Sequence, residues 1–324
     1  MEGNGLTWNR LWLCAAGVAI PLFPFFAGDQ FLHVMIMAFL YAYLGSCWNI
    51  LCGYGGQFSI GHSVFFGIGA YTSTLLFMRL GISPWLGMLA GGILAALVGL
   101  GFGFLTFRFG LKGHFFALAT IALCKGMEII ALNWDFVGGA AGLVIPPHDP
   151  SFIVFQFDKK VPFYYIMYGL MLLSILIVFL VNRSKLGLYL AAIREDEAAA
   201  QALGVTLVKY KIYAIVLSAF LTGLGGTFFA QYLTYIDPTF TIGIGMSIEI
   251  IVRPILGGVG TVMGPILGAF ILDPLAELSR NFLGGYTGAH MVSYGILLIV
   301  CCLFMPNGII EIPFFARIFG RKVR

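Results

Sequence analysis

The sequence contains little charge. Asp, Glu, Lys and Arg make up 10% of its 324 residues, hydrophobic residues make up 60%, and the mean hydropathy is +0.97. An ordinary soluble domain carries about 25% charged residues. A chain this apolar cannot hide its surface from water by folding, so its solvent must be the lipid bilayer. The net charge of +4 is spread over loops, which argues against a nucleic-acid partner.

The sequence also lacks the motifs of an enzyme. It contains no G-x-x-x-x-G-K-[ST] phosphate loop, no H-E-x-x-H and no G-x-S-x-G. No nucleophile is paired with a base, so we assign no catalytic residue and expect no cofactor bound by this chain. If ATP and Mg²⁺ drive the protein, a separate ATPase chain must hydrolyse the ATP.

Cysteines are few and are not spaced for a disulfide framework. All lie in or at the edge of apolar runs, without the histidine and acid spacing of a metal site, so we expect inert buried thiols and no metal. The six are Cys14, Cys47, Cys52, Cys124, Cys301 and Cys302.

Long apolar runs take the place of the missing polar surface. A bilayer core is crossed by about 20 mostly apolar residues in a helix, and ten runs are candidates. The runs cover residues 11–27, 31–51, 60–78, 84–107, 113–133, 162–181, 212–233, 239–256, 261–278 and 290–305. We therefore expect an all-α polytopic membrane protein with about ten transmembrane helices and one transmembrane domain over residues 1–324.

The distribution of lysine and arginine predicts the orientation, because cytoplasmic loops are enriched in these residues. With ten spans, twelve basic residues fall on the side of both termini and four on the opposite side. We therefore expect both termini to be cytoplasmic, with a cytoplasmic loop over residues 182–211 and a basic cytoplasmic tail over 306–324. Residues 134–161 form the longest outer loop, and their glycines and prolines predict an ordered non-helical cap.

A short polar island interrupts the apolar runs at residues 194–204. It predicts a two-turn helix that Asp196 caps at its N-terminus and Gly204 ends. A compact capped helix on a cytoplasmic loop suits docking to a soluble partner. The residues that we expect to couple to this partner are Arg194, Glu195, Asp196, Glu197, Ala198 and Gly204.

Glycine-rich segments predict helix breaks at the start of the third span and at the cytoplasmic end of the eighth. Residues 53–71 contain six glycines, and irregular backbone at membrane depth is tolerated only when it is buried in protein or lines a water-filled cavity. Gln57, Ser59 and His62 therefore either line a translocation path or satisfy local carbonyls in a closely packed helix. The predicted helix-breaking glycines are Gly55, Gly56, Gly257, Gly258 and Gly260.

Two pairs of opposite charge lie inside spans. Lys125 and Glu128 are three residues apart, and Glu249 and Arg253 are four apart, so each pair shares a helix face. Such residues usually face the bundle interior or water. They either line the path of a zwitterionic solute or neutralise each other. For Asp273, which precedes a proline, we expect a kink with a capped backbone.

Four stretches resemble the LivM-like permease subunits of branched-chain amino acid ABC importers. Residues 53–71 are similar to the family's G-Y-x-G-Q-x-S-x-G-H-x-x-F-x-G-I-G-A-Y signature, and residues 185–204 to its cytoplasmic loop. Residues 247–269 are similar to its late glycine-rich span, and 138–143 to its outer-loop G-G-x-x-G-L. Against the general permease E-A-A-x-x-x-G pattern, Gly204 comes one residue late.

The resemblance implies a permease domain in a bacterial-type inner membrane. It also implies a second homologous permease in a heterodimer, two cytoplasmic ATPase subunits and an extracytoplasmic substrate-binding protein. The implied cargo is a branched-chain amino acid or a related solute of the urea and amide type. An ion-coupled secondary carrier is the rival interpretation, because broken helices and membrane acids fit it equally well.

Overall fold

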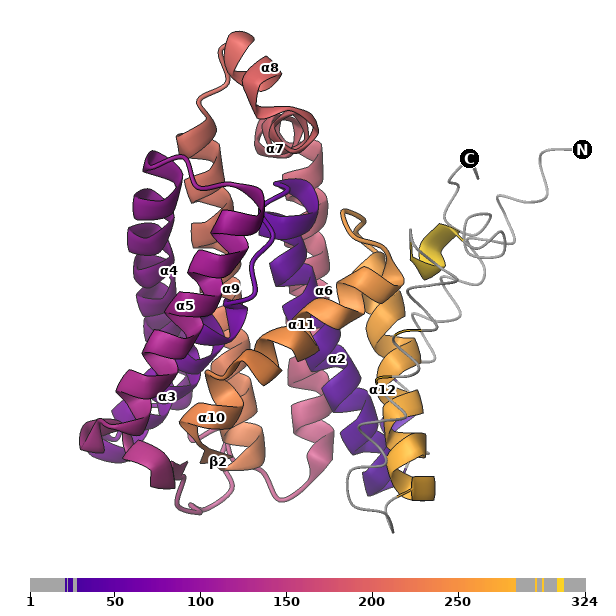
Figure 1. Cartoon of the computed structure of the whole chain (residues 1–324). Helices are drawn as coiled ribbons and strands as arrows, with labels where there is room; N and C mark the ends of the chain where they lie inside the picture. The colour runs from indigo at the N-terminus through magenta and orange to yellow at the C-terminus, as the bar shows by residue number, and fades with distance from the viewer. Residues whose placement is uncertain are drawn as a thin grey trace, which may run out of the picture.

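A computed structural model describes residues 28–283, together with positions 21, 23–25, 295, 299 and 308–311. Helices make up most of the described part (Figure 1). The longer helices are α2 (Asp29–Asn49), α3 (His62–Leu80), α4 (Pro84–Arg108), α5 (Gly113–Leu132), α6 (Lys160–Arg183), α9 (Leu207–Leu233), α11 (Ile244–Gly257) and α12 (Gly264–Leu283).

Short elements connect the long helices. The single-turn segments are η1 (Phe23–Phe25), the π-helix η2 (Ile50–Tyr54), η3 (Asp135–Val137), η4 (Gly139–Ala141) and η5 (Ile309–Glu311). The short helices are α7 (Lys185–Glu195), α8 (Glu197–Ala202) and α10 (Pro238–Thr241), and the strands are β1 (Leu143–Val144) and β2 (Tyr235–Ile236). In Figure 1, α7 and α8 lie at one end of the bundle, and α10 and β2 lie near the other.

Seven helical segments of the described part are long and apolar enough to cross a membrane. They correspond to the second to eighth predicted spans. Their bounds are Asp29–Tyr54, His62–Leu80, Pro84–Arg108, Gly113–Leu132, Lys160–Arg183, Leu207–Leu233 and Pro238–Gly257. The predicted span 261–278 lies in α12, which is helical but carries three charged residues and is not among the seven. The predicted spans 11–27 and 290–305 and the tail 306–324 lie almost entirely outside the described residues.

The eighth predicted span, 239–256, is not one continuous helix. It is divided into α10 and α11 at Ile242 and Gly243. The side chain of Asp237 caps α10 by accepting from the Phe240 N–H at 2.9 Å, and Pro238 fills the first helical position. These local signals favour a new helix start at residue 238, and Gly243 then precedes the start of α11.

Helices α3, α4 and α9 form the most closely packed part of the bundle. A Cβ placed on Gly69 would lie 1.9 Å from the Gly223 carbonyl oxygen, and one placed on Gly226 would lie 1.9 Å from the Phe66 carbonyl oxygen. Backbone of α3 and α9 is therefore in direct contact. The Thr227 hydroxyl adds a 3.1 Å hydrogen bond to the Gly69 carbonyl. Small residues allow this approach, which is a main source of helix association within a membrane.

The predicted outer loop 134–161 is ordered but not wholly non-helical, since it contains the short turns η3 and η4. Strand β1 pairs antiparallel with β2, with Leu143 opposite Ile236 and Val144 opposite Tyr235. The loop is thereby fastened to the connection between α9 and α10. Trp85 at the start of α4 stacks on Phe155, with ring centroids 4.4 Å apart. These contacts fix the loop over one end of the bundle.

We expect Gly69→Ala to lower the thermal stability of the purified protein in detergent. The added methyl group forces α3 and α9 apart, and such overpacking costs about 1–3 kcal/mol or more. The matched control is Gly101→Ala, because nothing lies within 4 Å of a Cβ at this α4 position. Alanine is also the better helix former. Equal melting temperatures for the two variants would contradict the close contact.

Candidate functional site

Helix α8 is built around its N-terminal cap. The Asp196 carboxylate accepts from the N–H groups of Ala198 at 2.8 Å and Ala199 at 3.0 Å, and these bonds lower the pKa of Asp196. The cap is therefore ionised at neutral pH and is lost only when acid protonates the carboxylate. Gly204 follows the helix with φ +85°, in the left-handed region. The prediction of a short helix between Asp196 and Gly204 is confirmed.

The preceding helix α7 was not predicted. Arg194 and Glu195 belong to its last turn, and the extended backbone of Asp196 separates them from α8. The structure therefore places the predicted coupling residues on two helices that meet at Asp196, rather than on one.

The outer face of the segment formed by α7 and α8 is exposed. The Glu195 side chain is 76% exposed and Leu203 is 85% exposed, whereas Ala200 is buried against the protein. Ala198 and Gly204 are exposed as well. Leu203 is thus an unburied apolar side chain at the end of α8, on the part of the chain that the sequence predicts to dock.

Arg194 points toward the bundle and lies against both glycine-rich breaks. Its Nη1 donates to the Gly53 carbonyl oxygen at 2.9 Å. A Cβ on Gly56 would lie 2.9 Å from Arg194 Cγ, and a Cβ on Gly260 would lie 2.8 Å from Arg194 Nη1. Glycine is required at both positions, which also have φ of +67° and +75°. The end of α7 therefore packs between the loop after α2 and the loop after α11.

Glu197 makes a second connection from α8 to the bundle. Its Oε1 accepts from Lys211 Nζ at 2.6 Å, and the Lys211 side chain is only 5% exposed. Gln57 Nε2 lies 3.3 Å from the same oxygen and 3.3 Å from the Gly55 carbonyl oxygen. Gln57 thus joins the first glycine-rich break to the capped helix.

The two breaks are also tied to each other. Asn49, the last residue of α2, accepts from the Gly260 N–H at 2.8 Å and donates to the Thr261 carbonyl at 2.8 Å. Helix α11 ends at Gly257, and a Cβ there would lie 1.7 Å from the Gly264 carbonyl oxygen. Gly258, with φ +127°, turns the chain toward α12.

His62 and Ser59 lie among packed helices. The His62 ring is fully buried, with Nδ1 3.0 Å from Ser59 Oγ and Nε2 2.8 Å from Ser218 Oγ. The Ser59 carbonyl accepts from Trp48 Nε1 at 2.9 Å. Both ring nitrogens of His62 are therefore satisfied by serine hydroxyls. The role of His62 and Ser59 in a translocation path stays a prediction.

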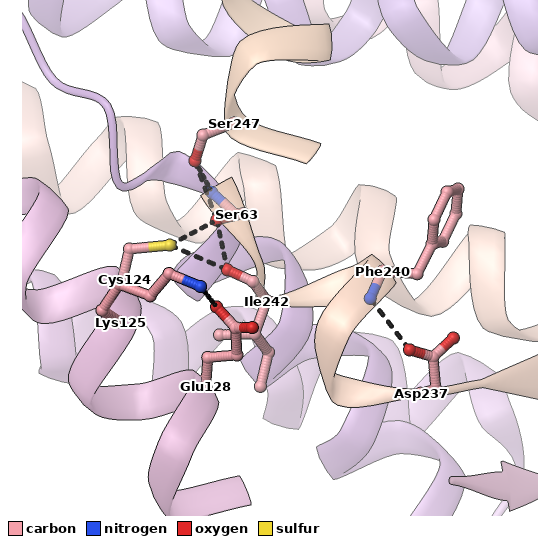
Figure 2. A network of polar contacts seen from close by, with 8 residues as sticks. All are labelled: Ser63, Cys124, Lys125, Glu128, Asp237, Phe240, Ile242 and Ser247. Atoms are coloured by element: carbon pink, nitrogen blue, oxygen red, sulfur yellow. Dashed lines mark hydrogen bonds and ion pairs between the residues drawn. The ribbon is translucent and has the colours of Figure 1, made fainter. Parts of the chain in front are cut away.

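Lys125 and Glu128 form an ion pair of 2.8 Å beside the break between α10 and α11 (Figure 2). The Lys125 side chain is 53% exposed, whereas that of Glu128 is 7% exposed. At the break, the Ile242 carbonyl accepts from Ser63 Oγ at 2.6 Å and Cys124 Sγ at 2.9 Å.

Ser247 completes this cluster, because its hydroxyl lies 2.8 Å from that of Ser63 (Figure 2). Sequence reasoning missed Ser63, Cys124 and Ser247. The only available signal was Gly243 after Asp237-Pro238, which marks a break but not the groups that satisfy it.

Arg253 lies at the centre of a buried charged cluster between α2, α11 and α12. Its guanidinium pairs with Glu249, as predicted, and also with Asp273 Oδ1 at 2.5 Å. The Arg253 side chain is 3% exposed and lies over the Tyr41 ring, 3.8 Å from its centroid. The explanation of Asp273 as only a kinked and capped backbone position is therefore wrong, since this carboxylate neutralises a buried arginine.

Comparison with known proteins places these features in a family. Residues 30–302 match the family described as the permease component of branched-chain amino acid transport systems. The chain belongs to this family. The permease LivM of Salmonella typhimurium is 29% identical over 329 residues, covering 93% of this chain and 75% of LivM. LivH of Escherichia coli K12 is 24% identical over 308 residues, covering 88% of this chain and 98% of LivH.

A relative with a different name is similar over a comparable length. The L-arabinose transport system permease AraH of Escherichia coli K12 is 26% identical over 303 residues, covering 90% of this chain and 86% of AraH. The family confirms the resemblance to LivM-like permeases. The chain is a multi-pass membrane permease subunit of the ABC type, and its function is transport rather than enzymatic catalysis.

We expect Arg253→Ala to destabilise the purified protein strongly, because it leaves the buried Asp273 carboxylate without its partner. Removing one member of a buried pair costs about 3–5 kcal/mol. The matched control is Arg183→Ala, which removes an arginine whose guanidinium lies 4.3 Å from the Phe179 centroid, and we expect a loss of about 1 kcal/mol or less.

The double variant Arg253→Met with Asp273→Leu tests the cause of this loss. Replacing a buried ion pair by apolar groups is often neutral, and the remaining partner Glu249 has a side chain that is 39% exposed, so the double variant should recover most of the stability. The stabilities of Arg253→Ala, Arg183→Ala and the double variant are compared by their melting temperatures in the same detergent. A double variant as unstable as Arg253→Ala would contradict the role given to the unpaired carboxylate.

Proposed function

We propose that this chain is one permease subunit of an ATP-driven, binding-protein-dependent importer of branched-chain amino acids or a related small solute. LivM and LivH are both named as permease proteins of a high-affinity branched-chain amino acid transport system, which supports this class of solute. AraH is named for L-arabinose transport. Because permeases of different solutes are similar to this chain, we assign the choice of solute chiefly to the delivering binding protein.

In this proposal, the chain crosses a bacterial-type inner membrane ten times, with both termini in the cytoplasm. It pairs with a second homologous permease, and the translocation path forms between them by alternating access. Two cytoplasmic ATPase subunits hydrolyse ATP with Mg²⁺, and a binding protein delivers the solute from outside. The segment 182–211, which contains α7 and α8, faces the ATPase.

The geometry of α8 is the observation that carries the proposal. The segment exposes Leu203 and Glu195 outward. Inward, Arg194 lies against both glycine-rich breaks, and Glu197 accepts from Gln57 of the first break. A partner that moves α7 and α8 would therefore move the end of α2 and the loop after α11 together. A helix that served only as a solvated linker would need neither the exposed leucine nor the inward contacts.

Lys125 supports the presence of a second permease. This cation lies within the span Gly113–Leu132 and is half exposed, although Glu128 pairs with it. A charged side chain at the bilayer centre costs about 2.5–3.5 kcal/mol on insertion scales. A partner subunit or a water-filled path between two permeases removes this face of α5 from lipid.

An ion-coupled secondary carrier of small zwitterions is the second candidate. It is favoured by the broken helix α10–α11 beside the Lys125–Glu128 pair, because carriers place their sites at such breaks. The two candidates are distinguished by purifying the tagged chain in mild detergent from its native membranes and identifying the proteins that accompany it. An ATPase and a second permease support the importer. A chain that is purified alone and transports in ATP-free vesicles under an ion gradient supports the carrier.

We expect Leu203→Asp to abolish co-purification of the ATPase, because it places a charge on the exposed apolar end of α8. The matched control is Phe109→Asp, which changes a residue that is 75% exposed in the connection between α4 and α5. The ATPase recovered per permease, measured on stained gels, should fall at least about tenfold for Leu203→Asp only, as expected when an interface anchor is lost. Normal recovery with Leu203→Asp would exclude α8 as the docking element.

We expect Arg194→Ala to separate ATP hydrolysis from transport. The exposed surface of α8 remains, so the ATPase should still co-purify, but the contact with Gly53 is lost. In proteoliposomes, the number of ATP molecules hydrolysed per solute imported should rise several-fold. The control is Lys185→Ala, an exposed basic residue at the start of α7. An unchanged ratio would show that Arg194 does not transmit the motion, and loss of the ATPase would make it a docking residue.

A further inference from the structure

A cavity of about 580 Å³ lies between α3, α4 and α5 and is covered at one end by η3. It is lined along α3 by Leu75, Leu76 and Leu80, and by Val98 of α4 and Met127 and Ile130 of α5. Arg79 is the only Asp, Glu, Lys or Arg residue among the residues that line it. The cavity is therefore apolar along its length, and Arg79 lies at one end of it.

The α3 residues that line the cavity span slightly more than one leaflet of a bilayer. It extends along α3 from Gly67 to Leu80, and thirteen steps of about 1.5 Å each give about 20 Å. The hydrocarbon core of a bilayer is about 30 Å thick, so one leaflet supplies about 15 Å of acyl chain. A cavity that extends this far along α3 accommodates a fatty acyl chain lying along the helix; we call it the α3–α5 groove.

The charged end has the features of a membrane–water interface. Arg79 is exposed in the last turn of α3, where its guanidinium lies 3.9 Å from the Phe136 ring centroid and donates to the Phe136 carbonyl at 2.8 Å. Trp134 stacks on Phe136 with centroids 5.5 Å apart. Tryptophan and arginine are typical of the headgroup level. No ion pair joins Arg79 to a carboxylate of the described residues.

The transported solute does not fit this cavity. An amino acid would bring both an ammonium and a carboxylate group into a space whose lining is almost wholly apolar. Burying an unpaired charge is too costly. The predicted path residues Gln57, His62, Glu249 and Arg253 are also absent from the lining. The occupant must be apolar over most of its length and anionic at one end.

We propose that this groove binds an anionic phospholipid, with one acyl chain between α3 and α5 and the phosphate on Arg79. The guanidinium keeps further N–H donors for phosphate oxygens, which arginine binds in a fork. The proposal does not depend on the transported solute. In the proposed orientation Arg79 lies on the extracytoplasmic side, which assigns the lipid to the outer leaflet. Only this assignment rests on the proposed orientation.

Native mass spectrometry of the purified chain tests the proposal, with phosphatidylglycerol and phosphatidylcholine of identical acyl chains as probes. We expect wild type to retain phosphatidylglycerol preferentially. Arg79→Ala should lower that retention about fivefold, as expected from one arginine near an anionic headgroup, and leave phosphatidylcholine unchanged. The matched control Arg183→Ala, which removes another arginine that lies over a phenylalanine ring, should have no effect.

A second variant tests the groove itself. Leu75→Trp fills the space between α3 and α5 and should lower the retention of both lipids, while a melting temperature close to that of wild type shows that the variant is folded. Equal retention of the two lipids by wild type would overturn the role of Arg79. Equal loss with Arg79→Ala and Arg183→Ala, or unchanged retention in a folded Leu75→Trp variant, would overturn the assigned site.

Discussion

The backbone of a membrane protein must satisfy its hydrogen bonds without water, and the broken helices of this chain depend on that constraint. At each break, side chains form hydrogen bonds with the backbone groups that the helices leave unpaired. Asn49 binds the backbone of the loop after α11, Trp48 binds the Ser59 carbonyl, and Ser63 and Cys124 bind the Ile242 carbonyl. The breaks are therefore defined joints between rigid helices, and glycine allows neighbouring backbone to reach them.

The positions of these joints relate the predicted coupling segment to the bundle. The joints after α2 and α11 adjoin α7 and α8, where Arg194 and Glu197 contact them. The joint between α10 and α11 lies instead beside Lys125 and Glu128 (Figure 2). Helix α11 thus connects a joint near the predicted coupling segment to one near the charged pair. In the proposed importer, α11 would carry a displacement from one joint to the other.

Features that depend on neighbours in the sequence could be predicted, and those that depend on tertiary contacts could not. Apolar runs located the described spans, and the Asp196 cap and the Glu249–Arg253 pair follow from residues two to four positions apart. Asp273 lies 20 residues from Arg253, and Glu197 lies 14 residues from Lys211. Nothing in the local pattern selects these partners, because helix packing brings them together. The break at Ile242 was missed because the hydropathy of the run hides the capping signal at Asp237.

Three cationic side chains at or within the membrane differ in how many carboxylates of the chain pair with them. Arg253 is buried and is neutralised by two carboxylates of the same chain, so its environment is protein. Lys125 is half exposed with one carboxylate, so its open side needs a polar neighbour that lipid cannot supply. Arg79 has no ion pair with a described carboxylate and lies at the end of an apolar groove. Arg253 has two carboxylate partners within the chain, Lys125 has one and Arg79 has none among the described residues. The fewer carboxylates the chain itself supplies to a cation, the more of the compensating charge or polarity must come from other molecules. The proposed second permease or water-filled path meets that need at Lys125, and an anionic headgroup meets it at Arg79.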